Sequence, residues 1–176
     1  MNKIKTAFAE EISALLMNYH KLNPIQKTAI KTILGKIGLG CGKSKIKYAQ
    51  KISKNALHSY RKKCSCVNEH MVPKQKYILD ELINLAERQE LTMDKILSVI
   101  NDYLNIAFIT SEENKKLPTR TNMPKEWDGV DIFARYNDTD IELIDFDDNL
   151  RQQLKIKSID EISSEIRNNT KNGKIS

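Results

Sequence analysis

The sequence predicts an α+β protein that is mostly helical, with a small ββα core and a basic, all-α N-terminal region. Three observations support this prediction. Apolar residues recur at helical spacing along most of the chain. Two short segments, 64–72 and 105–110, have instead the length and composition of strands. Basic residues are concentrated in the N-terminal half of the chain.

Several segments have the apolar spacing of amphipathic helices. In the first, every fourth residue from Ile4 to Leu16 is apolar, so these side chains share one face. Pro24 is expected in the first turn of the next helix, where proline is favoured. Further on, Thr92 is a suitable N-cap and Asp94 stands favourably in the first turn. The expected helices cover residues 4–20, 24–34, 45–62 and 75–88 and the segment from Thr92 to Leu104.

The two strand-like segments differ in character. Residues 64–72 are short and mixed, whereas 105–110 form a compact apolar run of the kind that lies buried in a sheet. Ser111 can cap a short helix directly after the second segment, with Glu112 and Glu113 in its first turn. The order in this region is therefore strand, capped turn and helix.

The chain is expected to divide into three regions. Residues 1–62 form a basic helical region, and residues 63–157 form the core, interrupted by a helical insertion at 74–104. Within the core, residues 117–140 contain two prolines and one tryptophan and are expected to be ordered but irregular. Residues 158–176 are polar and are expected to be partly disordered.

Composition and length are those of a globular protein. The 176 residues suit one domain with small appendages. Hydrophobic residues make up 40% and charged residues 30%, and no run of about eighteen apolar residues predicts a membrane span. Glu10 and Glu11 interrupt the apolar pattern where a signal peptide would need an unbroken apolar core. We therefore expect a cytoplasmic protein without a membrane partner.

The chain has three cysteines, Cys41, Cys64 and Cys66. This number is too small for a disulfide framework, and because it is odd the cysteines cannot all pair within the chain. The spacing Cys64-x-Cys66 is also too short for the paired cysteines of a zinc site, and no second pair exists. We therefore expect no structural zinc and no special role for these thiols.

The net charge of +6 is unevenly distributed. Residues 1–76 contain 16 Lys or Arg and 3 Asp or Glu, whereas residues 77–176 contain 13 and 20. A segment this basic attracts polyanions by counterion release. The 1–62 region is therefore a candidate grip on nucleic acid, and a solvated lysine-rich helix surface is the alternative.

The segment from Glu69 to Pro73 combines two side chains that suit phosphodiester hydrolysis. The carboxylate of Glu69 is a hard oxygen ligand for Mg²⁺ or a similar cation. The adjacent imidazole of His70 can take a proton from water near neutral pH. Neighbouring side chains of a strand point to opposite faces, so both reach one phosphate only if the pair lies at a bend. Pro73 is consistent with such a change of chain direction.

A second block begins at Asn105 and reaches Asn114, nine residues later. If residues 66–72 pair with 105–110 as a hairpin, the helix from Ser111 crosses beneath them. Asn114 would then project towards Glu69 as a second metal ligand. Asn105 could hold the loop that presents His70, or it could orient the imidazole directly.

Together, the Glu-His-x-Val-Pro segment and the Asn-x4-Thr-x3-Asn segment resemble the HNH (ββα-metal, His-Me finger) endonuclease family. The second block is especially similar to the HNH domains of CRISPR effector nucleases, in which an asparagine replaces the last histidine. The resemblance covers about residues 64–117. This chain has glutamate where aspartate is commoner, a long insertion at 74–104, and none of the cysteine pairs that brace many members.

The resemblance implies a role for each residue. His70 would be the general base, and Asn105 would be the middle asparagine of the catalytic motif. Glu69 and Asn114 would bind one divalent metal, with Mg²⁺ expected and Mn²⁺ also admitted by these ligands.

Six cations flank the two motifs and would bind the DNA backbone. They are Lys62, Lys63, Lys74, Lys115, Lys116 and Arg120.

The expected function is therefore metal-dependent DNA cleavage by an HNH-type endonuclease, of the kind found in restriction or phage defence. RNA remains an alternative target, and the sequence does not distinguish a monomer from a homodimer. Two other classes stay open. One is a non-catalytic DNA-binding or regulatory protein, and the other is an inhibitor-type interaction protein on a nuclease-like scaffold.

Overall fold

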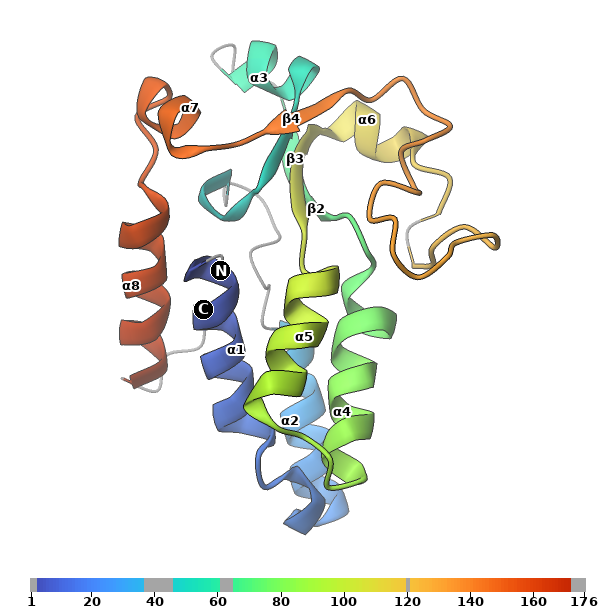
Figure 1. The fold of residues 1–176 in the computed structure, drawn as a ribbon, viewed down its shortest axis with the longest axis vertical. Coiled ribbons are helices and arrows are strands. Elements are labelled where there is room, and N and C mark those ends of the chain that lie inside the picture. Colours follow the sequence, from blue (N-terminus) through green and yellow to red (C-terminus); the bar gives the residue numbers. More distant parts are fainter. Residues whose placement is uncertain (1–2, 37–45, 61–64, 120, 172–176) are drawn as a thin grey trace. The chain divides into compact units, whose positions relative to one another are not determined.

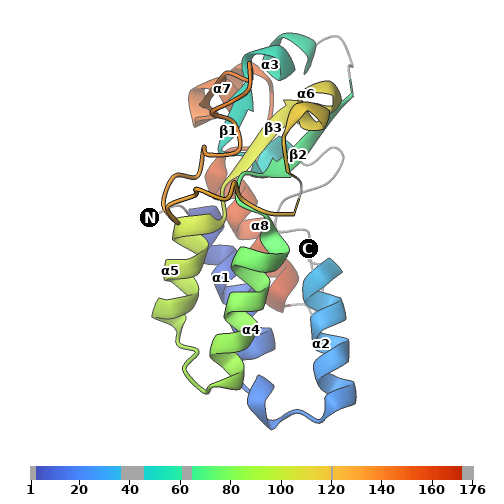
Figure 2. The ribbon, with the colours of Figure 1, turned by 90° about the vertical axis from the view of Figure 1, so that its right-hand side faces the viewer.

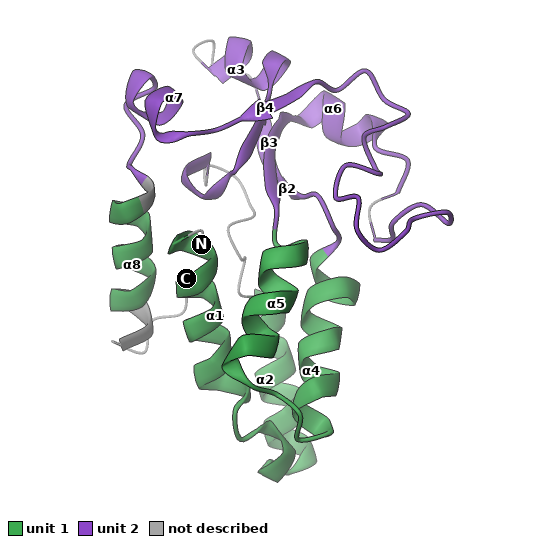
Figure 3. Cartoon of the chain, viewed as in Figure 1, with its two compact units in different colours: residues 1–39, 74–104, 160–176 green, residues 40–73, 105–159 purple. Residues whose placement is uncertain are grey.

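The structure is a computed structural model, and it describes residues 3–36, 46–60, 65–119 and 121–171 (Figure 1). The chain forms two compact units, each assembled from separate stretches of sequence (Figure 3). Unit 1 comprises residues 1–39, 74–104 and 160–176, and unit 2 comprises residues 40–73 and 105–159. This arrangement differs from the expected division into 1–62, 63–157 and 158–176. The 74–104 insertion belongs with the N-terminal helices and separates the two parts of unit 2.

Unit 1 is helical, and its core confirms the spacing of the first helix. The residues at every fourth position from Ile4 to Leu16 are buried. Residues 158–176 were expected to be partly disordered, but the described part of this segment forms a helix that buries Ile162 and Ile166. The unit contains α1 (Lys3–Leu16), α2 (Pro24–Lys36), α4 (Asp80–Glu87), α5 (Met93–Tyr103) and α8 (Ile159–Lys171), with a 3₁₀ turn at Tyr19–Lys21 and a π-helical turn at Gln75–Leu79.

Two details of unit 1 test the expected helix boundaries. α2 begins at Pro24, as the preference of proline for the first turn predicts. The spacing of Ile25, Ala29, Ile30 and Ile33 predicts that these residues share one apolar side of the helix, but Ile25 is 82% exposed and Leu34 is the residue of α2 that is buried. Thr92 caps α5, and its side chain accepts a hydrogen bond from Lys95 N.

Unit 2 contains a mixed four-stranded sheet in the part of the chain that the structure describes (Figures 1 and 2). The strand order is β2-β3-β1-β4. β3 pairs antiparallel with β2 and parallel with β1, and β4 pairs antiparallel with β1. The elements are β1 (Lys51–Ser53), α3 (Lys54–Tyr60), β2 (Cys66–His70), β3 (Ile106–Thr110), α6 (Ser111–Lys116), β4 (Leu143–Asp145) and α7 (Asp148–Gln153).

The single helix expected at 45–62 is wrong. The described part of this segment contains a 3₁₀ turn (Ile46–Tyr48), the short strand β1 and the helix α3. β1 lies between β3 and β4, so both edges of the strand are paired, and the side chain of Ile52 is fully buried. Backbone pairing with distant strands thus overrides a local helical pattern.

The two faces of the β2–β3 pair carry different layers. On one face, Ala107 and Ile109 belong to an apolar cluster against which Val67 packs. On the other face, the ring of Phe108 makes an edge contact with Tyr60 of α3, with the ring centroids 6.1 Å apart. The first face is covered by the segment after α6, which is irregular as expected. Its members in the cluster are Leu117, Tyr136 and Ile141, with Ile132 and Phe133 partly buried against them.

The coarse prediction of a mostly helical α+β protein is confirmed by these elements. None of the helices in the described stretches combines the length and the apolar character that crossing a membrane requires.

Candidate functional site

The expected pairing of the two motif-bearing strands is confirmed. β2 and β3 form an antiparallel pair in which Cys66 lies opposite Thr110 and His70 lies opposite Ile106. Just beyond the last pair, Met71 N donates a hydrogen bond to Asn105 O over 2.8 Å. His70 is therefore the last residue of its strand, and the residue after it, Met71, is hydrogen-bonded to the backbone of Asn105.

Glu69 and His70 occupy adjacent positions of this regular strand. Because side chains alternate along a strand, they point to opposite faces of the sheet. The side chain of Glu69 remains 22% exposed, whereas His70 is 7% exposed. The change of direction that would bring both groups together does not occur within β2, which stays paired through His70.

Arg135 joins both motif residues to a distant loop. Its Nη1 donates to Glu69 Oε1 over 2.9 Å and to the backbone oxygen of His70 over 2.8 Å. Its Nε donates to Thr119 O over 3.0 Å, and Nη2 donates to the same oxygen. Arg135 is fully buried. The guanidinium thus ties the end of β2 to the segment that follows α6.

Asn114 lies in α6, a short helix with a well-defined start. The expected N-cap, Ser111, is wrong by one residue, because the cap is Thr110. Thr110 Oγ1 accepts from Glu113 N, and the Glu113 carboxylate accepts from Thr110 N, which completes a capping box. Asn114 follows Glu113 directly and is half-buried.

The carboxylate of Glu113 also holds α6 to another part of unit 2. Oε2 accepts from Ser53 Oγ over 2.7 Å, and Oε1 accepts from Asn55 Nδ2 over 3.1 Å. Ser53 ends β1 and Asn55 lies in the first turn of α3. A buried carboxylate with this many donors is well compensated, so it fixes the helix that carries Asn114.

The six cations expected to contact DNA have different environments. Lys62, Lys63 and Arg120 lie outside the described residues. Lys74 belongs to unit 1, where its Nζ donates to Gly35 O over 3.2 Å.

The remaining two cations, Lys115 and Lys116, lie in the last turn of α6, and both are exposed. Lys116 forms an ion pair with Asp140 over 2.8 Å, and this hydrogen bond raises the pKa of Lys116. Of the two, Lys116 thus has its charge partly neutralised by a neighbouring carboxylate.

The oxygen donors of the site suit a hard cation in kind. Glu69 and Asn114 offer a carboxylate and an amide oxygen, and both side chains are partly accessible. Arg135 already occupies Glu69 Oε1, and the described residues contain no group of three or more His, Cys, Asp or Glu suited to a metal. Mg²⁺ often retains several waters and relies on one or two protein oxygens together with substrate phosphate, and a carboxylate and an amide are the kinds of oxygen ligand it uses.

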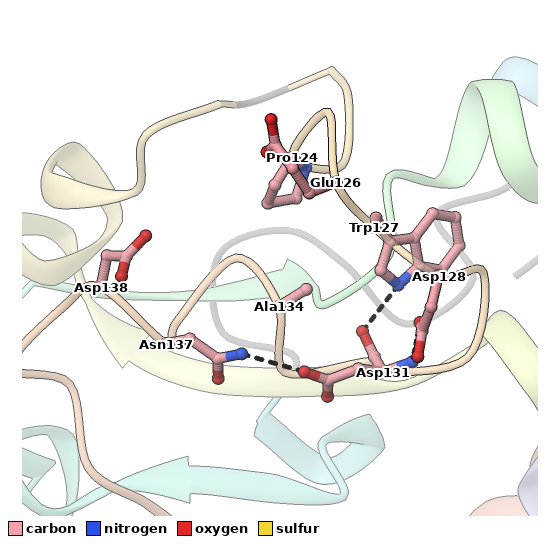
Figure 4. A pocket seen from close by; sticks show the side chains of 8 residues that line it. All are labelled: Pro124, Glu126, Trp127, Asp128, Asp131, Ala134, Asn137 and Asp138. Atoms are coloured by element: carbon pink, nitrogen blue, oxygen red, sulfur yellow. Dashed lines mark hydrogen bonds between the residues drawn. The ribbon is translucent and has the colours of Figure 1, made fainter.

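A separate pocket of about 350 Å³ lies in the irregular segment of unit 2 (Figure 4). Trp127 lines it and donates from Nε1 to Asp131 O over 2.8 Å, so the indole braces the loop and is only partly buried. Asn137 donates from Nδ2 to the carboxylate of the same Asp131 over 2.9 Å (Figure 4). The pocket contains none of the residues expected to form the site. Its lining is completed by Pro124, Glu126, Asp128, Ala134 and Asp138.

Two residues at the site were not predicted from the sequence. Arg135 stands between apolar and aromatic neighbours, which is a weak signal for a buried arginine, and its ion-pair partner is 66 positions away. Glu113 was expected only as a favourable charge in a first turn. The Thr-x-x-Glu spacing from residue 110 is the capping-box pattern that could have identified it.

Neither a protein-family model, nor a curated protein, nor a solved structure gives a significant match to this chain.

Proposed function

We propose that the protein is a metal-dependent endonuclease of the HNH type that hydrolyses phosphodiester bonds in DNA. The observation that carries this proposal is the register of β2 and β3, which places His70 at a strand end beside Asn105. A capped helix with Asn114 follows the second strand directly. This is the strand–strand–helix order in which the resemblance assigns roles to these residues.

In the proposed reaction, the His70 imidazole accepts a proton from the attacking water, which is the work of a general base near neutral pH. The backbone bond from Met71 N to Asn105 O holds the chain just behind the histidine. Because His70 is only 7% exposed, the imidazole must become accessible to the attacking water when DNA binds. Glu69 and Asn114 would hold one Mg²⁺ ion, which would supply charge stabilisation at the scissile phosphate. Because Glu69 and His70 point to opposite faces of β2, both would act on one phosphate only if the end of the strand bends when DNA binds.

The test is plasmid nicking by the purified protein with Mg²⁺ or Mn²⁺, compared with EDTA. His70→Ala should lower the cutting rate by about 100-fold or more, the range for loss of a general base. His58→Ala is the matched control, because His58 is an exposed histidine in α3 of the same unit. Cutting that persists in EDTA, or is lost equally in both variants, contradicts the proposal.

A non-catalytic DNA-binding protein is the second candidate. The observation that favours it is the burial of His70, together with the commitment of Glu69 to Arg135. Such a protein would bind DNA in a salt-dependent way without metal. It would be identified by unchanged DNA binding in EDTA and in His70→Ala, with no cutting of double-stranded DNA, single-stranded DNA or RNA.

A further inference from the structure

The guanidinium of Arg135 contacts both residues of the Glu69-His70 pair and nothing in the solvent. It is 0% exposed, and Nη1 alone bonds the Glu69 carboxylate and the His70 backbone oxygen. The opposite side of the guanidinium bonds Thr119 O through Nε and Nη2. One planar group thus fixes three points of unit 2.

The burial of this cation explains why the arrangement should be rigid. A buried charge is tolerated only when an opposite charge and hydrogen bonds compensate it. Here the carboxylate of Glu69, 2.9 Å from Nη1, provides the opposite charge, and two backbone oxygens accept the remaining bonds. Moving Glu69 away would leave the buried guanidinium without its counter-charge, so the carboxylate is held in place.

We propose that Arg135 is a positioning residue of the candidate site. It sets where the Glu69 carboxylate points and where the backbone of His70 lies relative to the segment that follows α6. Since Arg135 is fully buried, it does not contact DNA and acts only through these two residues. The effect of Arg135 on kcat rests on the proposed nuclease function. Its effect on the positions of Glu69 and His70 does not depend on that function.

The informative variant is Arg135→Lys. Lysine keeps the charge, but its single ammonium cannot bond Glu69 and His70 on one side and Thr119 on the other. We expect kcat for DNA cutting to fall by about 10- to 100-fold, the usual cost of losing a group that orients an active-site residue. KM for DNA should stay unchanged, because no contact with DNA is removed.

Arg151→Lys is the matched control. Arg151 is an equally buried arginine of the same unit, 1% exposed, and it also donates to backbone oxygens. Two of them are Lys47 O and Ala49 O, in the turn that leads into β1, and none of its acceptors belongs to the Glu69-His70 pair. Arg151→Lys should lower the unfolding temperature without lowering kcat of the folded enzyme. An equal fall of kcat in both variants would reduce Arg135 to a structural role and overturn the proposal.

A second readout does not depend on nuclease activity. The chain contains only three histidines, so their imidazole NMR signals can be assigned by substitution. Arg135→Lys should shift the His70 signals and leave those of His20 and His58 unchanged. Arg151→Lys should leave His70 unchanged. If the wild-type protein does not cut, the nuclease proposal fails, and the positioning of His70 is decided by these spectra alone.

Should Arg135→Lys fail to fold, the wild-type protein still provides a test. The Nε–H proton of Arg135 should exchange slowly with water and show through-space contacts to protons of Thr119. The Nε–H of Arg88, whose side chain is exposed, provides the reference for fast exchange. Exchange of the Arg135 proton as fast as that of Arg88 would overturn the proposal.

Discussion

Ser53 Oγ donates a hydrogen bond to Glu113 Oε2 over 2.7 Å and so joins β1 to the first turn of α6, although the two residues are 60 positions apart. The same carboxylate completes the capping box of α6 with Thr110 and accepts from Asn55. The helix that carries Asn114 is thus fixed at its start by a single buried side chain.

Glu113→Ala should destabilise unit 2 by about 3 kcal/mol, because it removes the capping box and leaves the buried hydroxyl of Ser53 and the half-buried N–H of Thr110 without their acceptor. Urea unfolding measures this loss. Glu112→Ala is the control, since Glu112 is the exposed neighbour in the same first turn and should change stability by no more than about 0.5 kcal/mol. Equal stability of the two variants would show that the buried network contributes little.

The pairing of β2 with β3 was predictable because both strands have local signatures. The run from Ile106 to Thr110 is apolar and short, and its partner precedes a proline. β1 was not predictable in this way. Its three residues are too few to show a period of two, and Ile52 also fits the helical spacing of the surrounding segment. Its strand conformation depends on β3 and β4, which are distant in sequence.

The candidate site was likewise predictable only in part. The positions of His70 and Asn105 at neighbouring strand ends follow from the hairpin. The commitment of Glu69 to Arg135 does not, because a buried ion pair between positions 66 residues apart leaves no periodic pattern in the sequence. The helix at the C-terminal end was missed for a different reason. Ile162 and Ile166 have helical spacing, but they are isolated in a polar segment.

Lys5 should make the stability of unit 1 depend on pH. Burial lowers the pKa of Lys5 from 10.5 to about 8, and the charge of Asp102 opposes this shift. The folded state thus loses this proton near pH 8, whereas the unfolded state keeps it up to about pH 10.5. The penalty for the buried cation is therefore fully present below pH 8. It disappears as the pH rises to about 10.5, which raises the unfolding free energy by about 3 kcal/mol.

Lys5→Met should remove this dependence while keeping a side chain of similar length. Urea unfolding of the variant and the wild type should differ most in pH dependence between about pH 8 and 10.5. The loss of the bond from Lys5 Nζ to Asn101 O, 2.7 Å long, lowers the stability of the variant, whereas removal of the buried charge raises it below about pH 8. Lys3→Met, at an exposed lysine of the same helix, should follow the wild-type slope. If the unfolding free energies of the wild type, Lys5→Met and Lys3→Met change with pH in parallel, the pH dependence does not come from Lys5.

Lys115 and Lys116 should contribute differently to DNA binding. Both are exposed at the end of α6, but Asp140 partly neutralises Lys116. Lys115→Ala should weaken binding and reduce the slope of log K against log salt by about one, as expected for loss of one phosphate contact. Lys116→Ala should have a smaller effect on both quantities.

Asp140→Asn provides the reciprocal test of this difference, since it releases Lys116 from its ion pair. Binding should become tighter and the salt slope steeper, and the additional substitution Lys116→Ala should abolish the gain. Fluorescence anisotropy with a labelled duplex measures the wild type and all four variants. An identical salt slope for Lys115→Ala and the wild type would remove the end of α6 from the DNA interface.

The Mg²⁺ concentration for half-maximal cutting should depend on Asn114 and not on Glu112, an acidic residue of the same helix. Asn114→Ala removes one of two proposed oxygen ligands, so the Mg²⁺ concentration for half-maximal cutting should rise at least about tenfold, the lower bound for loss of a residue that only orients a ligand. Asn114→Asp retains an oxygen ligand and should restore the wild-type midpoint or lower it. Glu112→Ala removes an exposed negative charge two residues away and should leave the midpoint unchanged. If Asn114→Ala and Glu112→Ala shift the midpoint equally, Mg²⁺ responds to the general charge of α6, and Asn114 is not its ligand.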